Sequence, residues 1–134
     1  MNLQIDSSDN MIVEPYLHDS TLESVQRTAE GLALRFKGAD GEEASLDFPG
    51  RDIHLWAEGV VFPVTVSTAY FWESSQEKQI DNVLGSVVAT RFRKTLASYQ
   101  KSGWLLLATT NHGDPFVVFG PASAMPEVSE WVAE

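Results

Sequence analysis

The tripeptide His18-Asp19-Ser20 contains the three residue types of a hydrolytic triad. In such a triad the hydroxyl, the imidazole and the carboxylate converge in space, with the imidazole in the middle. Consecutive residues of an extended chain point to opposite faces, so these three do not converge. A local turn in which Asp19 or Ser20 bonds nearby backbone amides is the favoured interpretation. The sequence also contains no Gly-x-Ser-x-Gly elbow, phosphate-binding glycine loop or dinucleotide fingerprint, so no catalytic residue is predicted.

Metal-binding residue types are present but are not grouped. The three histidines, His18, His54 and His112, lie far apart, and no two of them have the i, i+4 spacing of helical metal ligands. His112 beside Asp114 fits a turn, although a functional pocket at these two residues stays open. The absence of cysteine removes disulfides, thiolate nucleophiles and thiolate metal sites. We therefore predict no metal site and no cofactor.

The charge of the chain is strongly negative, with 19 acidic residues against nine Lys and Arg and a net charge of −10. Nucleic acid is a poor partner for such a chain, because phosphates bind mainly through Lys and Arg. A basic protein is a better partner, because complementary fields accelerate association. The partner-binding candidates are five carboxylates in and after the first clear hairpin: Glu42, Glu43, Asp47, Asp52 and Glu58. The alternative is a solvated strand face whose charge only favours solubility.

Period-2 alternation dominates the first half of the chain. Residues 32–37 and 43–48 alternate apolar and polar side chains on either side of Gly38-Ala39-Asp40-Gly41, which predicts a β-hairpin. The segment after Thr21 is interpreted as a strand with a bulge rather than a helical turn. Residues 53–56 predict a short strand. Residues 60–72 predict another, which Pro63 restricts to a late start or an edge. Its alternation places five residues on one face: Val64, Val66, Thr68, Tyr70 and Trp72.

An amphipathic helix is predicted over residues 75–102, because apolar residues recur there at i, i+3, i+4 and i+7. Residues 104–119 predict a closing hairpin around a turn at 111–115, and its unbroken apolar run 104–108 predicts a central strand. Residues 128–132 could form a short helix or a terminal strand. The resulting fold class is α+β: one domain, residues 1–134, with an antiparallel sheet of five to seven strands packed against one long helix.

Two segments resemble families of small bacterial domains. Residues 16–25, Tyr-Leu-His-Asp-Ser-Thr-Leu-Glu-Ser-Val, resemble the "LHDS-x-L-x-S-V" opening of a group that includes immunity proteins, which neutralise toxins from competing bacteria. Residues 104–118, with Gly113-Asp114-Pro115 between two apolar runs, resemble the strand–"GDP"–strand element of the SMI1/KNR4-like group. The second resemblance implies a structural hairpin rather than an active site. Both imply an immunity-type function.

The leading functional hypothesis is therefore a non-enzymatic immunity-type protein that binds and neutralises a basic toxin or effector domain. The alternative is an acidic secretion-chaperone-like module that holds an effector segment, usually as a homodimer; an uncharacterised enzyme is a third reading. The sequence contains no 18-residue apolar run for a membrane span and no basic, apolar leader at its start. A cytoplasmic location is expected.

Overall fold

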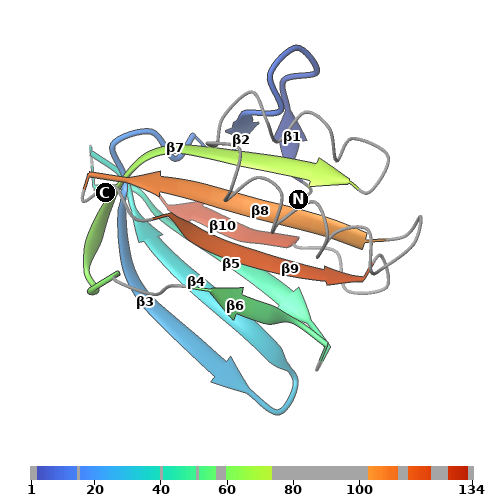
Figure 1. Ribbon diagram of the computed structural model, residues 1–134. Coiled ribbons are helices and arrows are strands. Elements are labelled where there is room, and N and C mark those ends of the chain that lie inside the picture. The colour runs from blue at the N-terminus through green and yellow to red at the C-terminus, as the bar shows by residue number, and fades with distance from the viewer. Residues whose placement is uncertain are drawn as a thin grey trace.

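The computed structural model describes residues 3–14, 16–39, 41–50, 52–56, 60–73, 103–111, 115–121 and 127–132. All regular secondary structure in these ranges is β-strand (Figure 1). The strands are β1 (Gln4–Ile5), β2 (Ile12–Glu14), β3 (Thr21–Thr28), β4 (Gly31–Lys37), β5 (Glu43–Pro49), β6 (His54–Trp56), β7 (Val64–Glu73), β8 (Gly103–Thr110), β9 (Phe116–Pro121) and β10 (Glu127–Val132).

The predicted α+β class is wrong, since the described part of the chain is built of strands and contains no helix. The helix predicted over residues 75–102 lies outside the described residues. The prediction depended on one periodic stripe with several valines, and the segment also contains Gly85; valine and glycine are poor helix formers. The predicted count of five to seven strands is also too low, because the large sheet has eight strands and β1 and β2 form a second sheet that was not predicted.

Eight of the strands form one antiparallel sheet in the order β10-β5-β4-β3-β7-β8-β9-β6. Strands β3 and β7 pair through only two residues each, whereas β4 pairs with both of its neighbours along its whole length. The sheet folds back at this short junction, so that β3, β4 and β5 lie behind β7, β8 and β9 (Figure 1). A separate hairpin, β1–β2, reaches β7 through a bridge between Met11 and Tyr70. The result is two layers of strands that share one core.

The predicted hairpins are confirmed. Strands β4 and β5 pair from Gly31 opposite Pro49 to Lys37 opposite Glu43, and their buried residues alternate as expected. Strands β8 and β9 form the closing pair, and β8 lies between β7 and β9 with nearly every side chain buried. Residues 127–132 form an edge strand against β5. These segments follow the rule that side chains alternate between the faces of a strand.

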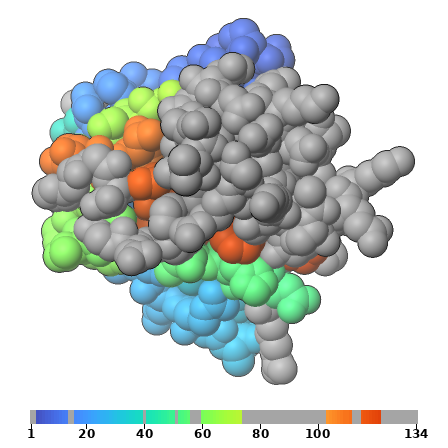
Figure 2. Space-filling model, viewed as in Figure 1, coloured from blue at the N-terminus to red at the C-terminus, as the bar shows by residue number. Residues whose placement is uncertain are grey.

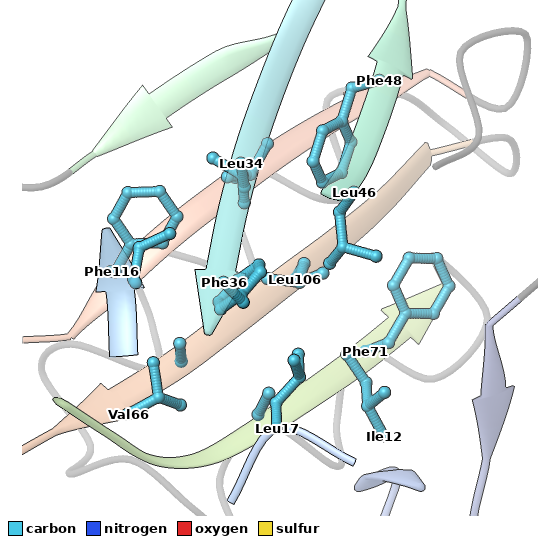
Figure 3. Close-up of a cluster of buried hydrophobic side chains, with 14 of the residues drawn as sticks. Ile12, Leu17, Leu34, Phe36, Leu46, Phe48, Val66, Phe71, Leu106 and Phe116 are labelled. Carbon is cyan, nitrogen blue, oxygen red and sulfur yellow. The ribbon is translucent and has the colours of Figure 1, made fainter. Parts of the chain in front are cut away.

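The core lies between the two layers (Figure 3). Leu34 and Phe36 from β4 and Phe48 from β5 point towards Leu106 of β8 and Phe116 of β9. The rings of Phe48 and Trp104, one from each layer, stack with centroids 5.3 Å apart. Each large apolar side chain buried in this way stabilises the fold by about 1.5–3 kcal/mol. These contacts hold the folded sheet closed.

Bulges change which face a strand presents, and one of them corrects the sequence prediction for β7. Val64 and Val66 lie in the core, and the register shifts between Val66 and Thr68. After the shift, Ala69 and Phe71 join the same core cluster, whereas Thr68 and Tyr70, predicted to share the face of Val66, do not. Trp72 is fully buried but lies outside that cluster. A second bulge, between Leu22 and Ser24, confirms the interpretation of β3 as a bulged strand. An extra residue on one strand of a pair exchanges its faces, which simple alternation does not anticipate.

Among the described residues, none belongs to a helix of the length and apolarity that crossing a membrane would require.

Candidate functional site

Two of the five predicted partner-binding carboxylates stand on one face of β5. Glu43 is exposed and Asp47 is half-buried, and both alternate with the core residues Ala44, Leu46 and Phe48. Ser45, between them on the same face, donates its hydroxyl to Asp47 Oδ1 at 3.1 Å. Strand β5 lies between β4 and β10, so these carboxylates are carried by a strand that is paired on both sides.

The other three candidates do not join this pair. Glu42 lies in the turn before β5, where its carboxylate packs over Gly38 and its carbonyl accepts the Gly38 amide at 2.6 Å. Asp52 is exposed and follows the far end of β5. Because a strand rises about 3.4 Å per residue, the two ends of β5 are about 20 Å apart. Glu58 lies outside the described residues. The five residues are therefore not one patch.

Basic side chains interrupt the acidic face. Lys37 of β4 is directly opposite Glu43, and Arg35 is directly opposite Ser45, between the two carboxylates. Both bases are exposed. Opposite charges on neighbouring strands stabilise a sheet, by roughly 0.2–1 kcal/mol per pair. The outer face of β3, β4 and β5 thus has mixed charge.

Acidic side chains nevertheless dominate the described surface. None of the acidic side chains whose exposure the structure describes is buried. They are Asp6, Asp9, Asp19, Glu23, Glu30, Glu42, Glu43, Asp47, Asp52 and Glu73, and the basic side chains of the same ranges are Arg27, Arg35 and Lys37. Figure 2 shows that the β1–β2 hairpin (dark blue) and the β3–β4 hairpin (light blue), which carry several of these residues, lie at the molecular surface. The negative charge is spread over the surface rather than concentrated at β5.

The segment 16–20, from the "LHDS" resemblance, forms a corner that is fastened to β7. The Asp19 amide donates to the Val66 carbonyl at 2.9 Å, and the Val66 amide donates to the Ser20 carbonyl at 2.8 Å. Leu17 fills the core and is 1% exposed. Asp19 has a φ of 60°, a left-handed conformation that Asp and Asn tolerate better than most residues. We call residues 16–20 the β7 corner, because they bind beside the bulge of that strand.

The polar side chains of the β7 corner point to different partners. Ser20 is fully buried, and its hydroxyl donates to the Leu17 carbonyl at 2.7 Å. His18 donates from Nδ1 to the Ser67 carbonyl, and its Nε2 lies 3.3 Å from Asp19 Oδ2. The predicted local turn is confirmed, although Ser20 bonds a carbonyl rather than an amide. The serine hydroxyl bonds the turn and not the imidazole, so the corner has the geometry of a structural turn and not of a triad.

The remaining histidines offer no metal-binding geometry in the part of the chain that the structure describes. His54 stacks on Phe119 with ring centroids 5.2 Å apart. His112 and Asp114 lie outside the described residues. No group of three or more His, Asp or Glu within the described ranges is placed to hold a metal ion.

Sequence reasoning missed Asn10, which connects the β1–β2 hairpin to β7. Asn10 is 1% exposed and has a φ of 62°. Its carbonyl accepts the Phe71 amide at 2.9 Å, and its own amide donates to the Asp6 carbonyl at 2.8 Å. Its Nδ2 donates to the Phe71 carbonyl at 3.2 Å. In the same turn, two hydrogen bonds from Ser8 lower the pKa of Asp6 below its ordinary value of 3.8. The run Asp-Ser-Ser-Asp-Asn at residues 6–10 is a turn signal that could have revealed this element.

Comparison with protein-family models, with curated proteins and with solved structures found no match to this chain.

Proposed function

We propose that this chain is a non-enzymatic, immunity-type bacterial protein that binds a basic toxin or effector domain in the cytoplasm and neutralises it. The observation that carries the proposal is the excess of acidic over basic side chains at solvent-accessible positions of the described strands and turns. With a net charge of −10, such a surface attracts a basic protein over a long range and disfavours acidic competitors.

The scaffold suits binding because the charged side chains stand on paired strands. Glu43 and Asp47 project from β5, whose opposite face is fixed in the core by Leu46 and Phe48. A group that is already ordered loses little entropy when it binds. Because Arg35 and Lys37 stand beside these acids, a complementary partner presents mainly basic residues with some acids among them.

A folded partner fits the described surface better than an unfolded effector segment. The exposed large apolar side chains among the described residues are Val13, Tyr16, Leu55 and Val61, and they belong to four different segments of the chain. A chaperone that holds an unfolded segment requires a contiguous apolar surface, whereas a folded partner requires only a few anchors within a polar rim.

Co-expression tests the proposal. The probe is the product of the gene adjacent to that of this chain in its source genome, expressed as the candidate effector domain with and without the chain in a sensitive bacterium. The expected result is restored growth, a one-to-one complex on light scattering, and unchanged covalent masses of both proteins. Wild-type growth inhibition despite full expression of the chain, or turnover of a ligand by the chain itself, would contradict the proposal.

A further inference from the structure

We propose that Tyr16 and Asp19, on the β7 corner, form an anchor for an arginine side chain on the surface of the protein partner. This inference rests on the proposed function and specifies one contact of the interface. None of the five predicted carboxylates lies on the β7 corner.

The exposure of Tyr16 sets it apart. Its side chain is 60% exposed, whereas each of the other aromatic residues whose exposure the structure describes is buried or half-buried. An exposed tyrosine ring offers a large apolar face with a polar tip, and Tyr is enriched among the residues that dominate binding energy. Tyr16 is therefore the aromatic side chain of the described surface that is available to a partner.

The backbone beneath Tyr16 is ordered before any partner arrives. Leu17 is buried in the core, and the amide of Asp19 and the carbonyl of Ser20 both bond to Val66 of β7. The Ser20 amide and hydroxyl both bond the Leu17 carbonyl, which closes the turn. Binding on such a corner orders few new torsions, so more of the contact energy is retained.

His18 contacts both the Tyr16 ring and the Asp19 carboxylate. Its ring lies against Tyr16 with centroids 5.9 Å apart at 52°, and its Nε2 lies 3.3 Å from Asp19 Oδ2. The bond from His18 Nδ1 to the Ser67 carbonyl fixes the imidazole on β7. An aromatic face and a carboxylate that is 66% exposed therefore belong to one short, ordered surface.

Arginine is the side chain that matches this pair of groups. Its planar guanidinium can stack on an aromatic face and also donate two parallel hydrogen bonds to a carboxylate. The ammonium of lysine has no planar face and makes a single point contact. The acidic surface of the chain draws a basic partner towards the corner, and Tyr16 with Asp19 then selects arginine over lysine.

The test measures affinity and kinetics between the purified chain and the effector domain of the co-expression experiment. We expect Tyr16→Ala to raise the dissociation constant about 30-fold, mainly through faster dissociation, as for an aromatic anchor. Tyr16→Phe should remain within about threefold, because stacking needs the ring and not the hydroxyl. Asp19→Asn should weaken binding about tenfold; Asn tolerates the left-handed conformation, so the backbone is preserved.

Matched controls remove the same groups elsewhere. Val61→Ala truncates another exposed apolar side chain, 74% exposed, and Glu30→Gln removes an exposed charge that is not among the five predicted carboxylates. Both should change affinity by less than about threefold. On the partner, arginines are replaced by lysine one at a time. One replacement should weaken binding about as much as Tyr16→Ala, with no further loss when the two are combined.

The two proposals fail separately. If the effector domain binds the wild-type chain but Tyr16→Ala binds within threefold of it, the arginine anchor is wrong and the proposed function stands. If Tyr16→Ala matters but no arginine replacement does, the anchor residue is right and its arginine occupant is wrong. If the effector domain does not bind at all, the proposed function and this inference both fall.

Discussion

Replacing Gly31 with alanine should destabilise the fold strongly, because this glycine is placed where β4 meets the end of β5. Gly31 has a φ of 153°, a conformation that side-chain-bearing residues rarely adopt. A Cβ atom there would overlap the carbonyl oxygen of Phe48 and stand 3.1 Å from its carbon. Both atoms belong to the backbone of the paired strand, so the strands must separate by about 1 Å to reach ordinary van der Waals contact.

The expected loss in the free energy of unfolding is the sum of three contributions. The unfavourable φ costs about 1–3 kcal/mol for a residue with a side chain. The hydrogen bond from the Gly50 amide to the Glu30 carbonyl, 2.9 Å, adjoins Gly31, and its loss costs about 1 kcal/mol. A smaller unfolded-state entropy for alanine offsets roughly 0.4–1 kcal/mol. We expect a net loss of about 2–3 kcal/mol in the free energy of unfolding.

Gly38→Ala, at the other end of β4, is the matched control. A Cβ atom at Gly38 meets mainly the carboxylate oxygen of Glu42, which is the mobile end of a flexible side chain. The expected change is within about 1 kcal/mol of zero, since that side chain can move away. Urea unfolding followed by tryptophan fluorescence measures both variants, with equal m-values required for the comparison. Equal stabilities of the two variants would refute the steric argument.

The remaining predictions concern the core, the β7 corner and the first turn. Phe48→Ala should lower the free energy of unfolding by about 3–5 kcal/mol, because it removes the ring that stacks on Trp104 between the two layers; a loss below 1 kcal/mol in urea unfolding would place Phe48 outside the core. Ser20→Ala should cost about 1 kcal/mol through its lost bond to Leu17, again by urea unfolding, and no loss would mean that the turn holds without the hydroxyl. The Asp6 carboxylate should stabilise its turn fully above pH 3.8, the pKa of an ordinary Asp. This stabilisation should be lost as the pH falls through the pKa of Asp6 in the folded protein, which is lower. The Ser8 amide resonance should follow that titration in the wild type and stay constant in Asp6→Asn; the same pH dependence in both would exclude Asp6 as its cause.

Local pairing was predictable from the sequence, whereas the long-range arrangement was not. Alternating residues in β4 and β5 indicated the hairpin because each buried residue is followed by an exposed one. The fold-back between β3 and β7 depends on only two residue pairs far apart in the chain, and no periodicity encodes them. The register shift after Val66 arises in the pairing of β7 with β8, which is distant in the chain, so simple alternation grouped Thr68 and Tyr70 with Val66 although Ala69 and Phe71 share its core.

The sequence shows which acidic residues are candidates for the site, but not which of them lie together in the fold. Glu43 and Asp47 share a face because two strand positions separated by an even number do so in any strand. Glu42 and Asp52 were grouped with them by sequence proximity, although a paired strand of about 20 Å separates these two residues. The interruption by Arg35 and Lys37 depends on the register of β4 against β5. The exposure of Tyr16 depends on the fastening of its neighbours to Val66, which no local pattern reveals.

If the acidic surface of this chain attracts a basic protein partner, the rate of their association depends on the salt concentration. The measurement is the association rate constant of the purified chain with the effector domain at low and high ionic strength. Screening shortens the range of the field from about 30 Å at 0.01 M salt to about 3 Å at 1 M. We expect the association rate constant to fall at least about tenfold, with a much smaller change in the dissociation rate constant. An association rate constant that does not change with salt would exclude electrostatic attraction as the basis of recognition.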